Sequence, residues 1–196
     1  MPVRRTQEER RTRTRGQIVQ AMIECLNEYG YSGATYARVA DRAGVSRGAM
    51  LHYFPDKVEL AVAAADYVRQ DGVDRVAARV PSLPAGPGRT AEALDLCREV
   101  FGGPLFHAAM EVWLRGRTEQ PLGDRMLPVR AQTIENIAQV MPALFGDHLA
   151  NRDDLPELAR LLAATLRGLA LEDRREGDQP ETWAYVRERL ATLVSN

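Results

Sequence analysis

Apolar residues recur with a helical period early in the chain. Between Ile18 and Tyr29 they stand at i, i+3, i+4, i+7, i+8 and i+11, which predicts the buried face of an amphipathic helix. Gly30 is expected to end that helix, because glycine readily takes the conformation that follows a helix. No segment alternates apolar and polar residues in the way that a half-exposed strand does. The pattern therefore predicts an all-α fold.

Residues suited to helix caps predict three further helices before residue 81. Thr35 and Ser46 are typical N-cap residues, and Gly44 between them is expected to close the first of two short helices. Asp56 is followed three residues later by a glutamate, which is the pattern of a capping box. A longer helix is therefore predicted from there to about residue 80, and the proline- and glycine-rich segment 81–88 is predicted as a loop.

The rest of the chain shows the same helical pattern. Helices are expected near 90–101, 104–117, 122–145, 153–175 and 180–195. Together these elements predict about nine helices, with a three-helix head at residues 1–57 and a longer helical bundle at 58–196.

The two short helices and the turn between them, residues 43–46, form a helix-turn-helix motif. Val45 and Phe54 lie nine residues apart and are expected to hold the second short helix against the other two. The side chains left on its outer face are small or cationic, namely Arg47, Gly48, Ala49 and His52. Small residues admit a helix to the major groove, and an arginine can contact guanine O6 and N7. The pattern favours DNA binding over the alternative, a short surface helix in a generic bundle.

Charge is distributed unevenly along a chain whose formal net charge is only −1. Residues 1–57 hold ten basic and six acidic side chains, whereas residues 58–196 hold 16 basic and 21 acidic ones. A basic end on an acidic body is typical of a nucleic-acid-binding head. The alternative is a solvated face with a basic tail.

Lys57 is the only lysine of the sequence, and it stands in the first turn of a predicted helix. The helix macrodipole disfavours a cation there by about 0.3–1 kcal/mol. A phosphate would reverse that balance, because it accepts hydrogen bonds from the free backbone N–H groups and from the ammonium group. Thr35, at the start of an earlier helix, is expected to hold a second phosphate in the same way. The alternative is an exposed lysine without a role.

Residues 30–60 resemble the DNA-binding region of the TetR family of transcriptional regulators. The resemblance is carried by Gly30-Tyr31, Thr35, Val39-Ala40, the turn Ala43-Gly44-Val45-Ser46, Gly48, Tyr53-Phe54, Lys57 and Leu60. It implies a homodimer that presents two recognition helices to an inverted-repeat operator. It also implies a pocket for a small-molecule effector in the C-terminal domain, and it favours repression over activation.

The same resemblance implies which residues contact DNA. Thr35, Tyr53 and Lys57 are expected at phosphates, and Arg47, Gly48, Ala49 and His52 are expected at the bases; Tyr36 and Ser46 complete the predicted DNA-binding set. Leu51 stands where the family commonly has a tyrosine that touches phosphate. This chain lacks that hydroxyl, and Tyr53 or His52 is expected to compensate.

Two apolar stripes near the C-terminus predict a dimer interface. They consist of Leu158, Leu162, Leu166 and Leu169 on one helix and of Trp183, Val186 and Leu190 on the next. Two helices alone cannot bury both stripes, so a second copy is expected to complete a four-helix interface. The alternative is that both stripes pack onto their own subunit.

A ligand pocket is expected around the helices near 104–117 and 122–145. The candidate residues are Phe106, His107, Met110, Trp113, Met126, Arg130 and Ile134. Stripes of this composition are also typical of plain core, but with the family resemblance they predict a pocket for a largely apolar molecule. His107 and Glu111 are spaced as two metal ligands would be, yet no third ligand follows, so no metal is expected.

The remaining motifs exclude several classes of protein. The sequence contains no P-loop, dinucleotide fingerprint, GxSxG, HExxH or CxxC, so no enzyme activity and no cofactor are expected. Its apolar runs are too short to cross a membrane, and its two cysteines are expected to be buried thiols in a reducing cytoplasm. Abundant arginine and alanine hint at a bacterial genome of high GC content. The sequence thus predicts a ligand-responsive regulator; the alternative is a helical small-molecule-binding or scaffold protein without specific DNA binding.

Overall fold

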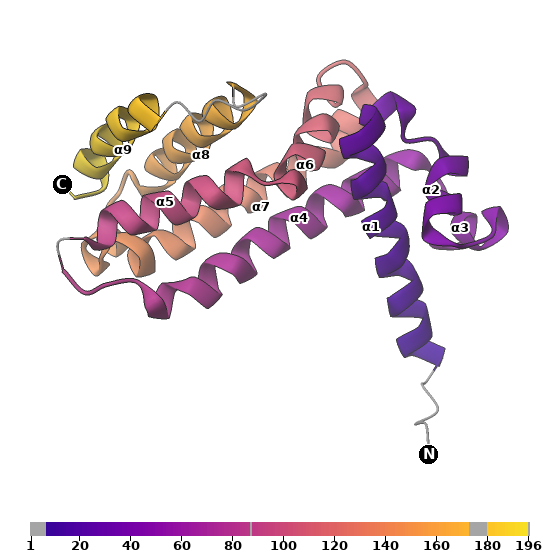
Figure 1. Cartoon of the computed structure of the whole chain (residues 1–196), viewed down its shortest axis with the longest axis horizontal. Helices are drawn as coiled ribbons and strands as arrows, with labels where there is room; N and C mark the ends of the chain where they lie inside the picture. Colours follow the sequence, from indigo (N-terminus) through magenta and orange to yellow (C-terminus); the bar gives the residue numbers. More distant parts are fainter. Residues whose placement is uncertain (1–6, 87, 173–179, 196) are drawn as a thin grey trace. The chain divides into compact units, whose positions relative to one another are not determined.

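The computed structural model describes residues 7–86, 88–172 and 180–195 (Figure 1). Over these ranges the chain forms nine α-helices, two short 3₁₀ helices and no strand. The α-helices are α1 (Gln7–Gly33), α2 (Tyr36–Ala43), α3 (Arg47–Tyr53), α4 (Lys57–Arg79), α5 (Arg89–Gly102), α6 (Pro104–Arg115), α7 (Gln120–Phe145), α8 (Leu155–Glu172) and α9 (Pro180–Ser195). The all-α prediction is confirmed. The last three residues of the helix expected at 153–175 lie outside the described ranges.

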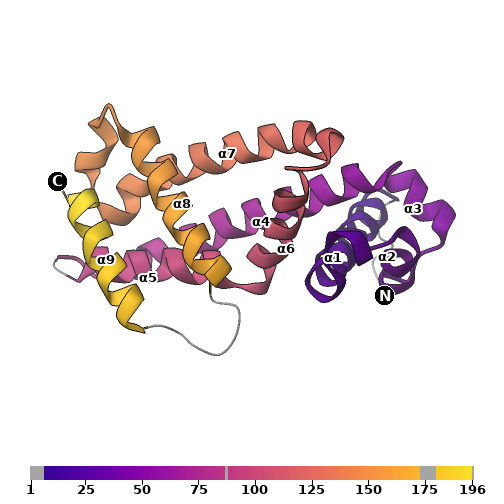
Figure 2. The same cartoon turned by 90° about the horizontal axis from the view of Figure 1, so that it is seen from above.

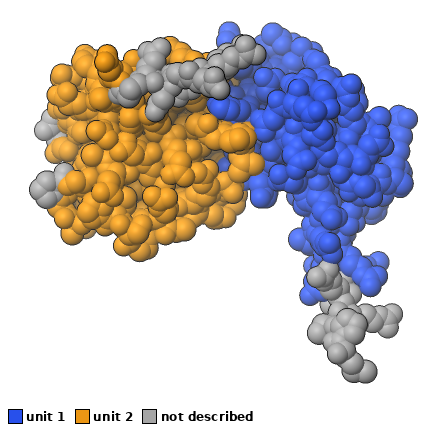
Figure 3. Space-filling model, in the orientation of Figure 1, with its two compact units in different colours: residues 1–68, 107–129 blue, residues 69–106, 130–196 orange. Residues whose placement is uncertain are grey.

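The chain divides into two compact units (Figure 3). The first contains the described residues up to Val68 together with His107–Val129, and the second contains Arg69–Phe106 and the described residues from Arg130 onward. The described part of the predicted head, residues 7–57, falls within the first unit. That the head is a domain of its own stays a prediction.

The core of the first unit is built on the apolar stripe of α1. Ile18, Met22 and Cys25 are fully buried, and so are Met50 and Phe54 at the end of the helix-turn-helix. Fully burying an apolar side chain contributes about 1.5–3 kcal/mol. The head is therefore held by a small core to which all three of its helices contribute.

Gly30 interrupts α1 as the sequence predicts, but one more turn follows it. Its φ of 65° and ψ of 178° are non-helical, and the segment from Tyr31 to Gly33 forms the last turn of α1. A left-handed φ of this kind favours glycine. A Cβ at Gly30 would also approach Oε2 of Glu111 to 3.1 Å, so the corner of the chain is closely packed against α6.

In the second unit, α8 and α9 pack on α5 (Figure 2). Asp95 of α5 binds two residues of α9. One carboxylate oxygen accepts a hydrogen bond from Nε1 of Trp183 at 2.7 Å, and the other accepts one from the guanidinium of Arg187 at 2.8 Å. Cys97 is buried in the same core, and burial raises the pKa of its thiol to about 12. Cys25 is buried in the first unit. Both cysteines are free, so the prediction of buried thiols is confirmed.

This packing corrects the predicted dimer interface. Of the residues proposed for it, Leu158, Leu162, Leu166, Trp183 and Leu190 are at most 7% exposed in the single chain, and Leu169 and Val186 pack against the same core. The reason is that α5 packs against both α8 and α9, and its buried face covers the two stripes. The two stripes therefore pack onto their own subunit, which the sequence argument had treated as the alternative.

No helix in the described ranges is both long enough and apolar enough to cross a membrane.

Candidate nucleic-acid interface

Local hydrogen bonds define the helix-turn-helix. Oγ1 of Thr35 accepts a hydrogen bond from the backbone N–H of Arg38 at 3.4 Å, and Oγ of Ser46 accepts one from the N–H of Ala49 at 3.1 Å. Gly44 has a φ of 65° and ends α2 in the left-handed conformation. Both predicted N-caps and the predicted glycine turn are confirmed. The caps fix where α2 and α3 begin, and so fix which side chains α3 presents outward.

Two side chains anchor α3 from its inner side. Met50 and Phe54 have no exposed surface, whereas Val45, which the sequence predicted as an anchor beside Phe54, is half-buried. The hydroxyl of Tyr36 donates to the carbonyl of Phe54 at 2.5 Å, which joins the start of α2 to the end of α3. Sequence reasoning missed Met50, although its spacing of four residues from Phe54 is that of a buried helix face.

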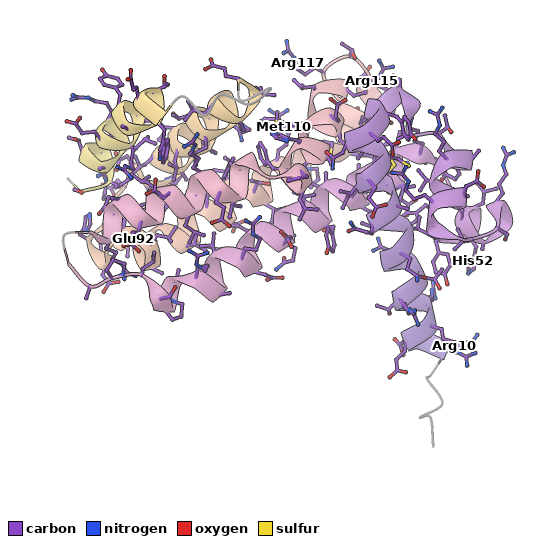
Figure 4. The ribbon with its side chains drawn as sticks, in the orientation of Figure 1. Arg10, His52, Glu92, Met110, Arg115 and Arg117 are labelled. Carbon is purple, nitrogen blue, oxygen red and sulfur yellow. The ribbon has the colours of Figure 1, made fainter. Side chains whose placement is uncertain are left out.

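The outer face of α3 carries the predicted base-contacting residues together. Arg47, Gly48 and His52 are exposed, and Ala49 is half-buried. A Cβ at Gly48 would meet no atom of the described residues within 4 Å, so none of them covers the backbone there. His52 projects from this helix (Figure 4), and Leu51 beside it is 46% exposed. The face is open, small-residued and cationic.

Two of the residues predicted at phosphates belong to the helix-turn-helix. Thr35 is exposed and Tyr53 is half-buried. The ring of Tyr53 meets that of His52 edge-on, with centroids 5.5 Å apart. The chain therefore places a phenol and an imidazole next to Leu51, where the family commonly has a tyrosine.

Lys57 has an internal partner that sequence reasoning missed. Its Nζ donates to the backbone carbonyl of Tyr31 at 2.5 Å and lies 4.2 Å from the centroid of the Tyr31 ring. Burial lowers the pKa of the Lys57 ammonium. Next to it, Oδ1 of Asp56 accepts from the N–H of Glu59 at 2.7 Å, as the predicted cap requires. Lys57 therefore stabilises the fold through its contact with Tyr31. That it also contacts a phosphate stays a prediction.

Tyr31 is the point at which the head meets α6 and Glu119, the residue before α7, within the first unit. Its side chain is buried, and its backbone N–H donates to Oε2 of Glu111 at 3.3 Å. Burial, followed by the nearby charge of Glu119, raises the pKa of the Tyr31 phenol to about 12. Arg115, labelled in Figure 4, pairs with Glu119 at 3.0 Å and lies 6.0 Å from the Tyr31 ring. Glu111 and Arg115 of α6 thus contact the corner where α1 turns toward α2.

The predicted pocket residues are divided between the two units. His107, Met110, Trp113 and Met126 belong to the first unit, and Phe106, Arg130 and Ile134 belong to the second. Both methionines are buried, the ring of Phe106 packs tilted against that of Phe101 with centroids 4.9 Å apart, and Ile134 packs against the core of the second unit. Arg130 is exposed, and its charge adds to burial in lowering the pKa of Arg167 on α8. A pocket formed by these residues stays a prediction.

Comparisons with known proteins agree with this geometry. Residues 18–64, which contain the helix-turn-helix, match the model of the bacterial regulatory proteins of the tetR family. The chain is 30% identical to the HTH-type transcriptional regulator CymR of Pseudomonas putida over 97% of each chain. It is 36% identical to the HTH-type transcriptional regulator BetI of Escherichia coli strain SE11, over 88% of this chain and 90% of BetI. Among solved structures it is similar to the multidrug binding protein EbrR complexed with ethidium, at 26% identity and a TM-score of 0.67, over 92% of this chain and 97% of EbrR.

Proposed function

The chain belongs to the TetR family of bacterial transcriptional regulators, and from this premise we propose that it binds an inverted-repeat operator as a homodimer, represses transcription there and leaves the DNA when a small molecule binds. The main support for DNA binding is the arrangement of α3. Met50 and Phe54 anchor its inner side in the core, and its outer side is exposed to solvent. An exposed helix of this kind, opened by a capped turn, fits the major groove.

Each residue of the interface receives a role in this proposal. Arg47 reads a guanine, and Gly48 and Ala49 allow the backbone of α3 to approach the base pairs. Thr35, Tyr53 and Lys57 contact phosphates, which fix the register without reading sequence. Ser46 and Tyr36 position α3, because their hydroxyls are already engaged with its first turn and with the carbonyl of Phe54.

We assign the dimer contact to the outward faces of α8 and α9, since the inward faces are buried in the chain's own core. Leu161 and Leu171 of α8 are 46% and 42% exposed, and Tyr185 and Leu193 of α9 are 62% and 43% exposed. Large apolar side chains left on two adjacent helices are typical of a surface that a second copy covers.

The dimer contact can be tested with matched leucine variants. Leu161→Glu should give folded monomers in light scattering, whereas Leu127→Glu should stay dimeric, because Leu127 is 58% exposed on α7 outside the assigned surface. A dimeric Leu161→Glu variant would place the contact elsewhere. Leu166→Glu is expected to unfold the second unit instead, since Leu166 is only 1% exposed.

The proposed effector is a largely apolar small molecule. EbrR, a protein of similar structure, is described in complex with ethidium. In this chain the first unit contains Met110, Trp113 and Met126, and methionine side chains adapt readily to apolar ligands. Binding would release DNA only if the effector prefers a conformation in which the two α3 helices no longer match the operator. Because the proposed partner is DNA, we place the protein in the cytoplasm, and we propose no catalytic activity for it.

The experiment that tests this function is selection of bound duplexes from random DNA. The proposal predicts enrichment of one motif with dyad symmetry, since a two-fold dimer presents two copies of α3. A motif without a dyad would contradict the homodimeric mode of binding. Absence of any enriched motif would favour the other candidate, a helical small-molecule-binding protein without sequence-specific DNA binding.

A further inference from the structure

The first turns of α1 extend beyond the core of the head. α1 begins at Gln7, but its first buried residue is Ile18, and residues 7–17 are exposed apart from the half-buried Thr14. At 1.5 Å per residue this segment is about 16 Å long. Figure 1 shows it projecting past α2 and α3. We call residues 7–17 the α1 extension.

The α1 extension carries an excess of arginine. Its basic residues are Arg10, Arg11, Arg13 and Arg15, and its acidic residues are Glu8 and Glu9. Glu8 and Glu9 suit the first turn of a helix, but the extension keeps a formal charge of +2, and the arginine pairs 10/13 and 11/15 are spaced to repel one another. Among the described residues, Arg10, Arg11 and Arg13 form no ion pair that would offset this repulsion. An external anion would neutralise it.

Arg11 and Arg15 lie on the face of α1 that packs toward the end of α3. Arg11, Arg15, Ile18 and Met22 follow one another at i, i+4, i+7 and i+11, so they share one face of α1. The guanidinium of Arg15 lies 5.0 Å from the centroid of the Phe54 ring, at the C-terminal end of α3. Arg11 therefore stands one turn farther out on the same face. Figure 4 shows Arg10 at the far end of the extension.

We propose that Arg10 and Arg11 bind backbone phosphates that flank the bases read by α3. This inference rests on the proposed function. A guanidinium matches the geometry of a phosphate and can donate two parallel hydrogen bonds to it. The contact would add affinity without adding sequence preference. A length of about 16 Å corresponds to about five phosphates along one strand at 3.4 Å each, which is long enough for a distinct flank contact.

The test compares two variants on two duplexes. One duplex carries only the selected site, and the other carries the same site with about five further base pairs of arbitrary sequence on each side. The variant Arg10→Gln/Arg11→Gln removes two charges from the extension and keeps good helix formers. The control Arg79→Gln/Arg117→Gln removes the same charge from exposed positions outside the head.

Wild-type protein and the control should bind the longer duplex more tightly at low salt, and the extension variant should not. Two arginines in each subunit would neutralise four phosphates per dimer, and each neutralised phosphate steepens the salt dependence of binding by about 0.9. When salt rises from 50 to 200 mM, the wild type should therefore lose about 100-fold more affinity for the long duplex than the variant loses. Affinity of the variant for the short duplex should be unchanged, which also shows that it is folded.

Two results would overturn the proposal. If the extension variant matched the wild type on the long duplex, the arginines would have no role at the flank. If it lost equal affinity for both duplexes, they would act at the core site instead. A wild-type protein that did not prefer the selected site over a scrambled one would overturn the proposed function as well, so the two failures are distinguishable.

Discussion

Replacing Gly48 with alanine should make the protein more stable and a poorer DNA binder. Gly48 lies in the first turn of α3, is exposed, and has no atom within 4 Å of the position that a Cβ would take. Alanine is favoured over glycine in a helix by up to about 1 kcal/mol. For a chain of this size that gain corresponds to a rise in melting temperature of about 2–4 °C.

The same methyl group should weaken operator binding. In the proposed interface the backbone of α3 at Gly48 approaches the floor of the groove, so an added methyl group would meet DNA. Overpacking of a closely fitted contact typically costs about 1–3 kcal/mol, which is about a 5- to 150-fold loss of affinity. Thermal unfolding followed by circular dichroism measures the first effect, and fluorescence anisotropy of a labelled operator measures the second.

Gly16→Ala is the matched control. Gly16 is exposed within α1, and a Cβ there would also meet nothing within 4 Å. This variant should show the same rise in stability with unchanged affinity for a duplex that carries only the selected site, which the α1 extension does not contact. A Gly48→Ala protein that is more stable and still binds the operator as tightly as the wild type would show that DNA does not approach α3 at this residue.

Three other predictions concern Lys57, Tyr31 and the cysteines. Lys57→Ala should weaken binding to operator and scrambled DNA alike and reduce the salt slope by about 0.9 per subunit; relaxed base preference at an unchanged slope would contradict the phosphate role. The phenol of Tyr31, whose pKa rises from 10.0 to about 12 on folding, should stabilise the fold fully below pH 10 and progressively less between pH 10 and 12. Urea unfolding of the wild type and of Tyr31→Phe across that range measures this, and equal pH dependence of the two proteins would refute it. A thiol reagent should modify Cys25 and Cys97 only after unfolding, because burial raises the pKa of both thiols, and rapid modification of the native protein would contradict their burial.

The features that sequence reasoning predicted correctly are those set by local contacts. Thr35, Ser46 and Asp56 each accept a hydrogen bond from a backbone N–H three residues away, so residue type and spacing are enough to identify the caps. Gly44 is likewise determined by the conformation of a single residue. These caps define the helix-turn-helix, and with it the face that α3 exposes.

The features that sequence reasoning missed depend on contacts between distant segments. The stripe that contains Leu166 correctly indicated burial, but periodicity does not say which helix covers a stripe, and here the cover is α5 of the same chain. Lys57 shows the same limit. Its place in a helix suggested an external anion, whereas its partner in the fold is a carbonyl 26 residues earlier, at Tyr31.

The central claim, that α3 reads DNA sequence, is tested most directly by the affinity ratio of Arg47→Ala for selected and scrambled duplexes. Arg47 is exposed on α3 and is proposed to contact a guanine, and loss of such a contact costs about 1–3 kcal/mol on the correct site and much less on others. The ratio should therefore fall by about 5- to 150-fold relative to the wild type, while binding to scrambled DNA changes little. A ratio equal to that of the wild type would contradict the assignment of base recognition to this face of α3.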